Sequence, residues 1–297
     1  MDYMKRHERR DVGGVDAWPD RSLTFEDFVV NTSNRAAFEQ ASLAGRTGAN
    51  GRGLFLYGGN GLGKTHLLNA IGNDLLAAGC GTSVLYVTAE RFNTACAMAL
   101  GSTVPADIDT FRSAYARPDL LLFDDVDKVG RSATVLREFG NAVQRLLRSG
   151  KRIIATANVP ARRLGDIDAR TRQAFMDFIP VEVREPELAT RMAILLRLAN
   201  QFMADVPDDV FVHVAERYPH DIGRMKRALI RILVQSRQWP SITLDRVRPL
   251  LATDKPDAGC PESVTTSRAD GIVPDPMPVE TDDDHSRPVA ITVKLSF

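Results

Sequence analysis

Residues 54–68, with the sequence LFLYGGNGLGKTHLL, decide the fold of this chain. The stretch opens with four apolar residues, as a short buried strand does, and ends with apolar residues at helical spacing, a pattern that continues to residue 78. Between them, residues 58–65 match the pattern G-x-x-x-x-G-K-[ST] in full. This order of strand, glycine-rich loop and helix predicts a phosphate-binding loop (P-loop), the alternative being a chance glycine-rich turn.

The glycines of such a loop let backbone N–H groups approach phosphate oxygens, and the start of the following helix adds a partial positive charge. We expect Lys64 to contact the β- and γ-phosphates and Thr65 to offer its hydroxyl to Mg²⁺. ATP and Mg²⁺ are therefore the expected cofactors. The residues of this segment expected to contact the nucleotide are Gly58, Gly59, Asn60, Gly61, Leu62, Gly63, Lys64, Thr65 and His66.

Strand and helix patterns alternate on both sides of this loop. Strands are expected at residues 54–57, 83–88, 120–123, 152–156 and 179–183, and helices at 34–43, 65–78, 89–100, 107–116 and 133–148. The alternation predicts an α/β fold, a parallel sheet with helices on both faces. From residue 186 onward only helical patterns follow, at 188–203, 208–218, 221–236 and 243–252, which predicts a small all-α lid domain.

The expected organisation has four parts. They are a flexible basic arm (1–22), an α/β nucleotide-binding domain (23–185), a helical lid (186–252) and an acidic, proline-rich, disordered tail (253–297). The 38 basic and 38 acidic residues balance, which argues against a protein that binds DNA over its whole surface.

The chain has neither the apolar core of a signal peptide nor an apolar run long enough to span a bilayer. Its three cysteines, Cys80, Cys96 and Cys260, show no metal-ligand spacing and favour a reducing compartment. We therefore expect a cytoplasmic protein with no membrane partner.

Polar side chains follow two of the expected strands. Asp124 and Asp125 come directly after the most apolar strand, where Asp124 would hold Mg²⁺ and Asp125 would orient an attacking water. Asn158 follows the next strand and could contact the γ-phosphate or that water. A solvated turn is the alternative for each, but the carboxyl edge of a parallel sheet is where ligands bind in such folds.

These elements together resemble the AAA+ ATPases, and within them the DnaA family of bacterial replication initiators. The likeness covers roughly residues 23–252 and is carried by residues 54–68, 84–88, 121–125 and 186–195. It implies that Phe28, Val30 and Asn34 lie near the adenine and that Asn158 is the first sensor of the γ-phosphate. It also implies ATP-dependent assembly into a filament or ring.

The sequence departs from the family at two arginine positions. The arginine finger, which completes a neighbour's site, falls on Ala174, so either Arg170 or Arg172 substitutes or hydrolysis stimulated by a neighbour is lost. The second sensor arginine falls on Gly223, and Arg224 reaches the phosphates only if its helix is rotated or starts differently. Because losing a finger can slow hydrolysis by about 10³- to 10⁵-fold, we expect a slow ATPase whose nucleotide acts mainly as a switch.

The family resemblance also guides the expected partners, which are a DnaA-type initiator, a helicase or another replication protein, with a homo-oligomer and single-stranded DNA as further possibilities. The stretches before residue 23 and after residue 252 resemble neither flanking domain of the family, which argues against sequence-specific duplex recognition. The terminal residues KLSF (294–297) faintly resemble peptides that dock on the sliding clamp.

Three hypotheses remain open. The first is a DnaA-like protein of replication initiation or its regulation, acting by ATP-gated assembly with a partner. The second is a helicase-loader or mobile-element ATPase that binds single-stranded DNA. The third is an adaptor that holds nucleotide without hydrolysing it.

Overall fold

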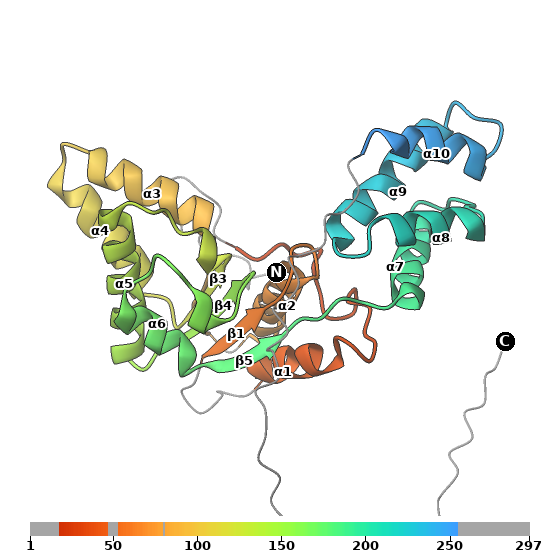
Figure 1. Ribbon diagram of the computed structural model, residues 1–297. Coiled ribbons are helices and arrows are strands. Elements are labelled where there is room, and N and C mark those ends of the chain that lie inside the picture. Colours follow the sequence, from red (N-terminus) through yellow and green to blue (C-terminus); the bar gives the residue numbers. More distant parts are fainter. Residues whose placement is uncertain (1–17, 47–52, 80, 255–297) are drawn as a thin grey trace, which may run out of the picture. The chain divides into compact units, whose positions relative to one another are not determined.

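The computed structural model of the protein describes residues 18–46, 53–79 and 81–254 (Figure 1). Within them lies one five-stranded parallel sheet with the strand order β2-β3-β4-β1-β5. The strands are β1 (Leu54–Tyr57), β2 (Val84–Thr88), β3 (Leu120–Asp124), β4 (Arg152–Ala157) and β5 (Ile179–Glu182). Tyr57 pairs with Ala157 and Thr88 with Asp124, so the carboxyl ends of these strands share one edge.

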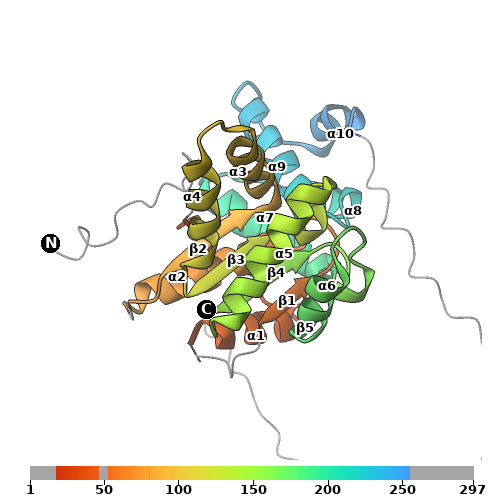
Figure 2. The ribbon, with the colours of Figure 1, turned by 90° about the vertical axis from the view of Figure 1, so that its left-hand side faces the viewer.

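Helices cover both faces of the sheet, as Figure 2 shows. The helices of this part are α1 (Arg35–Arg46), α2 (Lys64–Ala77), α3 (Ala89–Gly101), α4 (Pro105–Ala116), α5 (Ala133–Arg148) and α6 (Ala169–Met176). Alternate strand residues face opposite sides. The face under α3–α6 includes the buried residues Phe55, Leu121, Phe123, Ile153 and Ala155. The face under α1 and α2 includes Leu54, Leu56, Leu120, Leu122 and Ile154.

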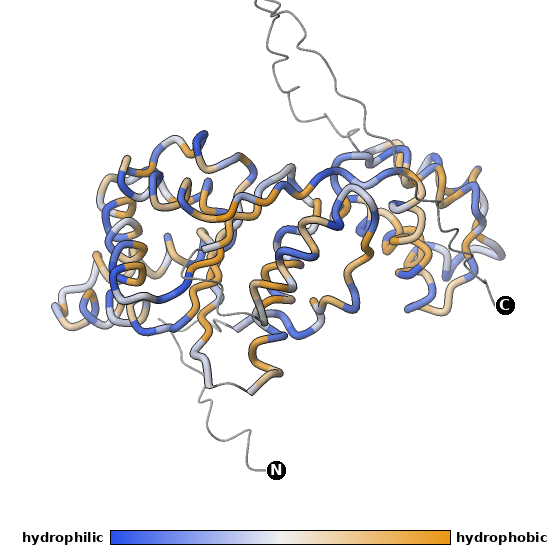
Figure 3. Tube along the Cα trace, turned by 90° about the horizontal axis from the view of Figure 1, so that it is seen from below, coloured by the Kyte–Doolittle hydropathy of each residue, from blue (hydrophilic) through white to orange (hydrophobic). Residues whose placement is uncertain are grey.

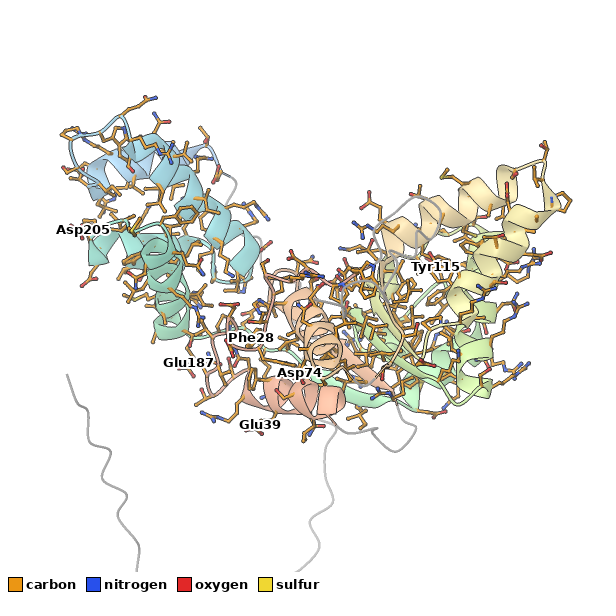
Figure 4. All side chains as sticks on the ribbon, turned by 180° about the vertical axis from the view of Figure 1, so that it is seen from behind. Phe28, Glu39, Asp74, Tyr115, Glu187 and Asp205 are labelled. Carbon is orange, nitrogen blue, oxygen red and sulfur yellow. The ribbon has the colours of Figure 1, made fainter. Side chains whose placement is uncertain are left out.

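Aromatic rings fill the core on the α3–α6 side. The Phe92 ring lies 5.0 Å from the ring of Tyr115, which is labelled in Figure 4, and 5.7 Å from that of Phe123. The Phe123 and Phe139 ring centroids are 4.8 Å apart. Each of these four side chains is at most 2% exposed. Such fully buried aromatic rings contribute strongly to stability, so this side fixes the position of β3 and the polar residues at its carboxyl end.

Between β5 and residue 254, the structure describes four further helices, which have a hydrophobic core of their own. They are α7 (Leu188–Gln201), α8 (Asp208–Arg217), α9 (Ile222–Ser236) and α10 (Leu244–Ala252). Leu195, Val210, Leu229 and Val247, one from each helix, are fully buried together. In Figure 3 the hydrophobic colour is strongest in the strands and alternates with the hydrophilic colour along the helices. The carboxylate of Asp221 accepts a hydrogen bond from the Arg224 N–H and so caps the start of α9.

The α/β fold expected from the sequence is confirmed, and the elements lie within a few residues of their expected bounds. The sequence did not predict α6 or the two 3₁₀ turns, η2 (Val126–Lys128) and η3 (Ala161–Arg163). Helix α6 has eight residues, of which only Thr171 and Phe175 are buried, so its apolar periodicity is too short to read. The tail from residue 255, with the KLSF peptide, and residues 1–17 of the arm lie outside the described residues.

The last residues of the expected arm lie against α2. The Asp20 N–H donates to Asn69 Oδ1 at 2.7 Å, and Asn73 Nδ2 donates to the Asp20 carbonyl at 2.7 Å. Pro19 is buried at Gly72, where a Cβ would come within 2.4 Å of the Pro19 ring. Two asparagines and a glycine on one helix face therefore hold the chain from residue 19, before the expected start of order at Leu23.

Among the described residues, no helix combines the length and the apolar character that crossing a membrane requires.

Candidate functional site

The P-loop leaves β1 at the carboxyl edge of the sheet and runs into α2. Gly63 precedes the helix at φ +99°, a left-handed conformation that favours glycine, and a Cβ there would lie 2.9 Å from the Phe28 ring. Gly61 has φ +71°, and a Cβ there would lie 2.1 Å from Asp221 Oδ1. Both glycines are needed because the backbone turns tightly and other residues approach it closely.

Lys64 joins the loop to the neighbouring strand. Its ammonium donates to the carbonyl oxygens of Gly58 (2.9 Å) and Gly59 (2.7 Å) and to Asn158 Oδ1 (3.0 Å). Burial lowers the pKa of Lys64, and the nearby carboxylates, Asp125 first, oppose this shift. The structure therefore brings Lys64 and Asn158 together at the carboxyl ends of the paired strands β1 and β4.

Asp124 lies at the end of β3, is 3% exposed and, within the described part of the chain, accepts hydrogen bonds only from hydroxyl groups. Thr65 donates to its Oδ2 at 2.8 Å, Tyr86 donates to the same oxygen at 3.0 Å, and Thr156 donates to Oδ1. Burial raises the pKa of Asp124, and among the described residues no lysine or arginine forms an ion pair with it. A carboxylate beside the Thr65 hydroxyl supplies the hard oxygen ligands that Mg²⁺ prefers, so these residues suit that ion.

The turn after β3 holds two more acidic residues. Asp125 adopts φ +61°, its N–H donates to the Thr156 hydroxyl (2.9 Å), and its Oδ2 lies 2.8 Å from Lys128 Nζ. Asp127 accepts hydrogen bonds from Asn158 N–H at 3.0 Å and from Asn158 Nδ2 at 2.8 Å. No sequence pattern indicated Asp127 or Lys128 as residues of this site.

A cavity of about 750 Å³ adjoins the loop and receives residues from the segment before α1, from α2, from α7 and from α9. Phe28 and Asn34 line it, as does His66, whereas Val30 is not among its lining residues. The Phe28 ring meets the His66 ring edge-on at 5.3 Å (the position of Phe28 is labelled in Figure 4). Asn34 exchanges two hydrogen bonds with Asn31, at 2.8 and 3.0 Å, which fixes the start of α1 at the cavity wall.

His66 also anchors the segment before α1. Its Nε2 lies 2.7 Å from the Thr24 carbonyl oxygen, so this nitrogen carries the hydrogen. Burial lowers the pKa of His66. The imidazole is therefore a neutral donor at pH 7 and holds residues 24–28 against the first turn of α2.

The predicted substitutes for the arginine finger differ in their surroundings. Arg172 donates to the carbonyl oxygens of Leu164 (2.8 Å), Gly165 (2.7 Å) and Ile167 (3.0 Å), and so closes the turn before α6. Arg170 is exposed on α6, and neither arginine lines the cavity at the P-loop. Arg172 would have to break three hydrogen bonds to act on a neighbouring molecule, which leaves Arg170 as the better candidate.

Helix α9 lines the cavity, but with residues other than the expected Arg224. Ile222, Gly223 and Lys226 line it, whereas the Arg224 guanidinium lies 5.4 Å from the Tyr218 ring centre. The alternative rotation or start of α9 that would bring Arg224 to the phosphates is not the one this structure adopts. Helical spacing from Gly223 could have indicated Lys226, since residues three apart share a helix face.

Comparison with known proteins identifies relatives of this chain. The family model described as the bacterial DnaA ATPase domain matches residues 20–181. The chromosomal replication initiator protein DnaA of Thermomicrobium roseum is 36% identical over 211 residues, covering 71% of this chain and 45% of the relative. The protein of the same name from Gloeobacter violaceus is 35% identical over 232 residues, covering 77% and 52%. The chain thus spans about half the length of the curated relatives it matches.

Solved structures give the same result. Domain III of the Thermotoga maritima replication initiation protein DnaA superposes with a TM-score of 0.72 at 28% identity, covering 78% of this chain and 97% of that one. A replication initiator DnaA bound to AMPPCP and single-stranded DNA gives 0.65 at 27% identity, covering 78% and 70%. Since the family model covers more than half of the 297 residues, the chain belongs to the family of bacterial DnaA ATPase domains, which are AAA+ P-loop proteins.

Proposed function

We propose that this protein binds ATP with Mg²⁺ at the P-loop, and that the bound nucleotide gates its assembly with a partner in the initiation of DNA replication or its control. The observation that carries the proposal is the connected set Lys64, Thr65, Asp124 and Asn158 at the carboxyl edge of the sheet. The DnaA structures bound to AMPPCP support a nucleotide at this position, and the names of the relatives support a role in replication.

The side chains divide the chemistry among them. Lys64 would exchange the Gly58 and Gly59 carbonyl oxygens for phosphate oxygens, while Thr65 and Asp124 would hold Mg²⁺. That ion neutralises charge on the phosphates when bound. Asp125 orients the attacking water once it leaves its ion pair with Lys128, and Asn158 contacts the γ-phosphate.

Hydrolysis is proposed to be slow. Ala174 at the finger position offers no charge, and Arg172 is held by three carbonyl oxygens. Asp125 is also engaged by Lys128 at 2.8 Å. The bound nucleotide would therefore persist long enough to act as a switch. In this proposal residues 23–185 form the nucleotide-binding domain and the helices α7–α10 form the lid within residues 186–252.

Nucleotide binding is tested first, by titrating fluorescent ATP and ADP analogues into the protein and its Lys64→Ala variant. We expect Lys64→Ala to weaken both nucleotides at least 10-fold, since it removes charge-assisted hydrogen bonds. Arg246→Ala, an exposed change on α10, serves as the control and should bind normally. Equal affinities of Lys64→Ala and the unchanged protein would refute the proposed site.

Gated assembly is tested by light scattering and by affinity capture with purified initiator and helicase, in ATP and in ADP. We expect larger assemblies or a captured partner in ATP only, and neither with Lys64→Ala. The same species in both nucleotides would show that the nucleotide does not gate assembly. An Asp125→Ala variant that assembles and functions normally would favour the non-hydrolysing adaptor.

Single-stranded DNA is a second candidate partner, because one solved relative is bound to it. Arg131 stands near the end of β3, with its side chain 90% exposed beside Asp166 at 3.2 Å. A labelled oligonucleotide should bind in ATP at low salt, and Arg131→Ala should weaken that binding. An oligonucleotide that fails to bind at low salt removes this candidate.

A further inference from the structure

Two lysines line the cavity at the P-loop from opposite parts of the protein, besides Lys128 in the turn after β3. Lys64 opens α2, and Lys226 lies in the second turn of α9. Gly223, one turn before Lys226, lines the same cavity, so the two residues share the face of α9 that looks onto it. Where the family resemblance places an arginine at Gly223, this chain therefore offers a lysine one helical turn further along.

Lys226 has no polar partner among the residues that the structure describes. Asp27, the carboxylate that raises the pKa of Lys226, accepts a hydrogen bond from the hydroxyl of Thr24 at 2.7 Å and pairs with Arg197 at 2.9 Å. Burial lowers the pKa of Lys226, and the like charge of Arg197 lowers it further, against a smaller opposing effect of Asp27. A half-buried ammonium without a partner is unfavourable, and an anion entering the cavity would relieve that cost.

Different charged groups act on the two lysines. Asp125, Asp124 and Asp127, at the end of β3 and in the turn after it, raise the pKa of Lys64. Arg197 lowers and Asp27 raises the pKa of Lys226, and Lys226 lowers the pKa of His66. His66, in the first turn of α2, lines the cavity together with Lys226, whereas Asn158 is not among its lining residues.

We propose that Lys226 is a nucleotide-binding residue that contacts the α- or β-phosphate beside the first turn of α2 and supplies the positive charge absent at Gly223. The inference rests on the proposed binding of nucleotide in this cavity. Since Asn158, the residue assigned to the γ-phosphate alone, does not line the cavity with Lys226, we expect Lys226 to contribute equally to the affinity for ATP and for ADP. The helical side of the site thereby holds the nucleotide without distinguishing the two.

The test compares Lys226→Met, which keeps an apolar stem and removes the charge, with Arg224→Ala and with the control Arg246→Ala. Dissociation constants for ATP and ADP are measured together with the melting temperature without nucleotide. We expect Lys226→Met to weaken both nucleotides by about 10-fold or more, as the loss of a charge-assisted hydrogen bond does. Its melting temperature without nucleotide should stay equal or rise, because an unpaired buried charge is gone.

Several results would overturn the inference. Normal nucleotide affinity of Lys226→Met would do so, as would a loss confined to ATP or a larger loss in Arg224→Ala. A fall in melting temperature that accounts for weaker binding would assign Lys226 a structural role instead. If Lys64→Ala loses nucleotide while Lys226→Met keeps it, only this inference fails; if both keep it, the proposed function fails as well.

Discussion

The two sides of the cavity differ in how their polar residues are held. On the sheet side, Lys64 donates a hydrogen bond to Asn158 at 3.0 Å, and Thr65 donates one to Asp124 at 2.8 Å. On the helical side, Gly223 carries no side chain, Arg224 lies over Tyr218, and Lys226 has no hydrogen bond or ion pair among the described residues. Hydrogen bonds preorganise the side chains of the sheet side, whereas Lys226 on the helical side would gain a polar partner only from a ligand.

The difference follows from geometry. Strand register places the carboxyl ends of β1, β3 and β4 at one edge, so any polar residue there joins the site. On a helix, a shift of one residue turns a side chain by about 100°. A single substitution in α9 can therefore remove a charged side chain from the cavity or restore one. The hydrogen-bonded residues of the sheet side tolerate little change.

The largest expected effect comes from breaking the sheet side at Asp124. Asp124→Asn keeps the size of the side chain but removes its charge, so we expect Mg²⁺ no longer to tighten ATP binding, with a loss of roughly 10- to 100-fold in Mg²⁺. Calorimetric titrations of ATP in Mg²⁺ and in EDTA measure this. Tyr86→Phe, which removes one hydroxyl from the same carboxylate, should keep the Mg²⁺ dependence. An Asp124→Asn variant that still responds fully to Mg²⁺ would rule out Asp124 as the ligand.

The helical side can instead be filled, with Gly223→Arg. The new side chain would start on the cavity wall, 3.1 Å from Asp221 Oδ1 and 3.4 Å from Arg227 Nη1, so both neighbours must shift slightly. We expect ATP affinity to rise by about 10-fold relative to ADP, because a guanidinium can form charge-assisted hydrogen bonds to the γ-phosphate. Gly223→Ala measures the cost of crowding alone. Equal changes for ATP and ADP would show that this position does not reach the γ-phosphate.

A smaller effect is expected from loosening one hydrogen-bonded residue of the sheet side. Asp127 accepts two hydrogen bonds from Asn158, and Asp127→Asn weakens them without touching the P-loop. Single-turnover hydrolysis should slow by about 3- to 10-fold, the effect of one hydrogen bond, while ATP affinity changes less than about 2-fold. Asp166→Asn, in an exposed ion pair, is the control. Equal losses in affinity and rate would mean that Asp127 supports binding and does not position Asn158.

Much of the sheet side was predictable because short-range patterns determine it. The run Leu120–Asp124 is apolar until its last residue, and the structure buries all of it, so the carboxylate at its end had to lie at the ligand edge. The glycine pattern fixed the loop in the same way. The roles of Asp127 and Lys128 could not be predicted, because the 3₁₀ turn that brings Asp127 to Asn158 has no periodic sequence pattern.

The contacts of the two arginines Arg172 and Arg224 could not be predicted from the sequence. Arg172 has a residue type and a position that suit catalysis, but the carbonyl groups of the turn at residues 164–167 engage it. Arg224 is one residue from the expected place and lies over Tyr218. Lys226 was visible only as one charge in a basic helix. Lys226 is distinguished from the other basic residues because it lines the cavity and because Asp27 pairs with Arg197. Both are features of the tertiary structure.

The smallest expected effect is on the pH dependence of the free energy of unfolding. It depends on His66, which lies where the sheet side and the helical side of the cavity meet. Its Nε2–H donates to the Thr24 carbonyl, and burial lowers its pKa; the like charges of Lys226 and Arg197 act in the same direction and Asp27 opposes them. The folded-state pKa thus lies below the unfolded value of about 6.5, so the unfolded chain binds more protons between the two values. The stabilisation by neutral His66 is complete above pH 6.5 and is lost as the pH falls through the folded-state pKa.

Urea denaturation without nucleotide at several pH values from 7.5 downward measures this loss. The free energy of unfolding of the unchanged protein should fall more steeply below pH 6.5 than that of His66→Gln, which cannot take up a proton. Lys226→Met should show an intermediate slope, because one of the like charges near the imidazole is gone. Equal slopes in the unchanged protein and Lys226→Met would mean that the helical side does not act on His66, and the two sides of the cavity would then be electrostatically independent.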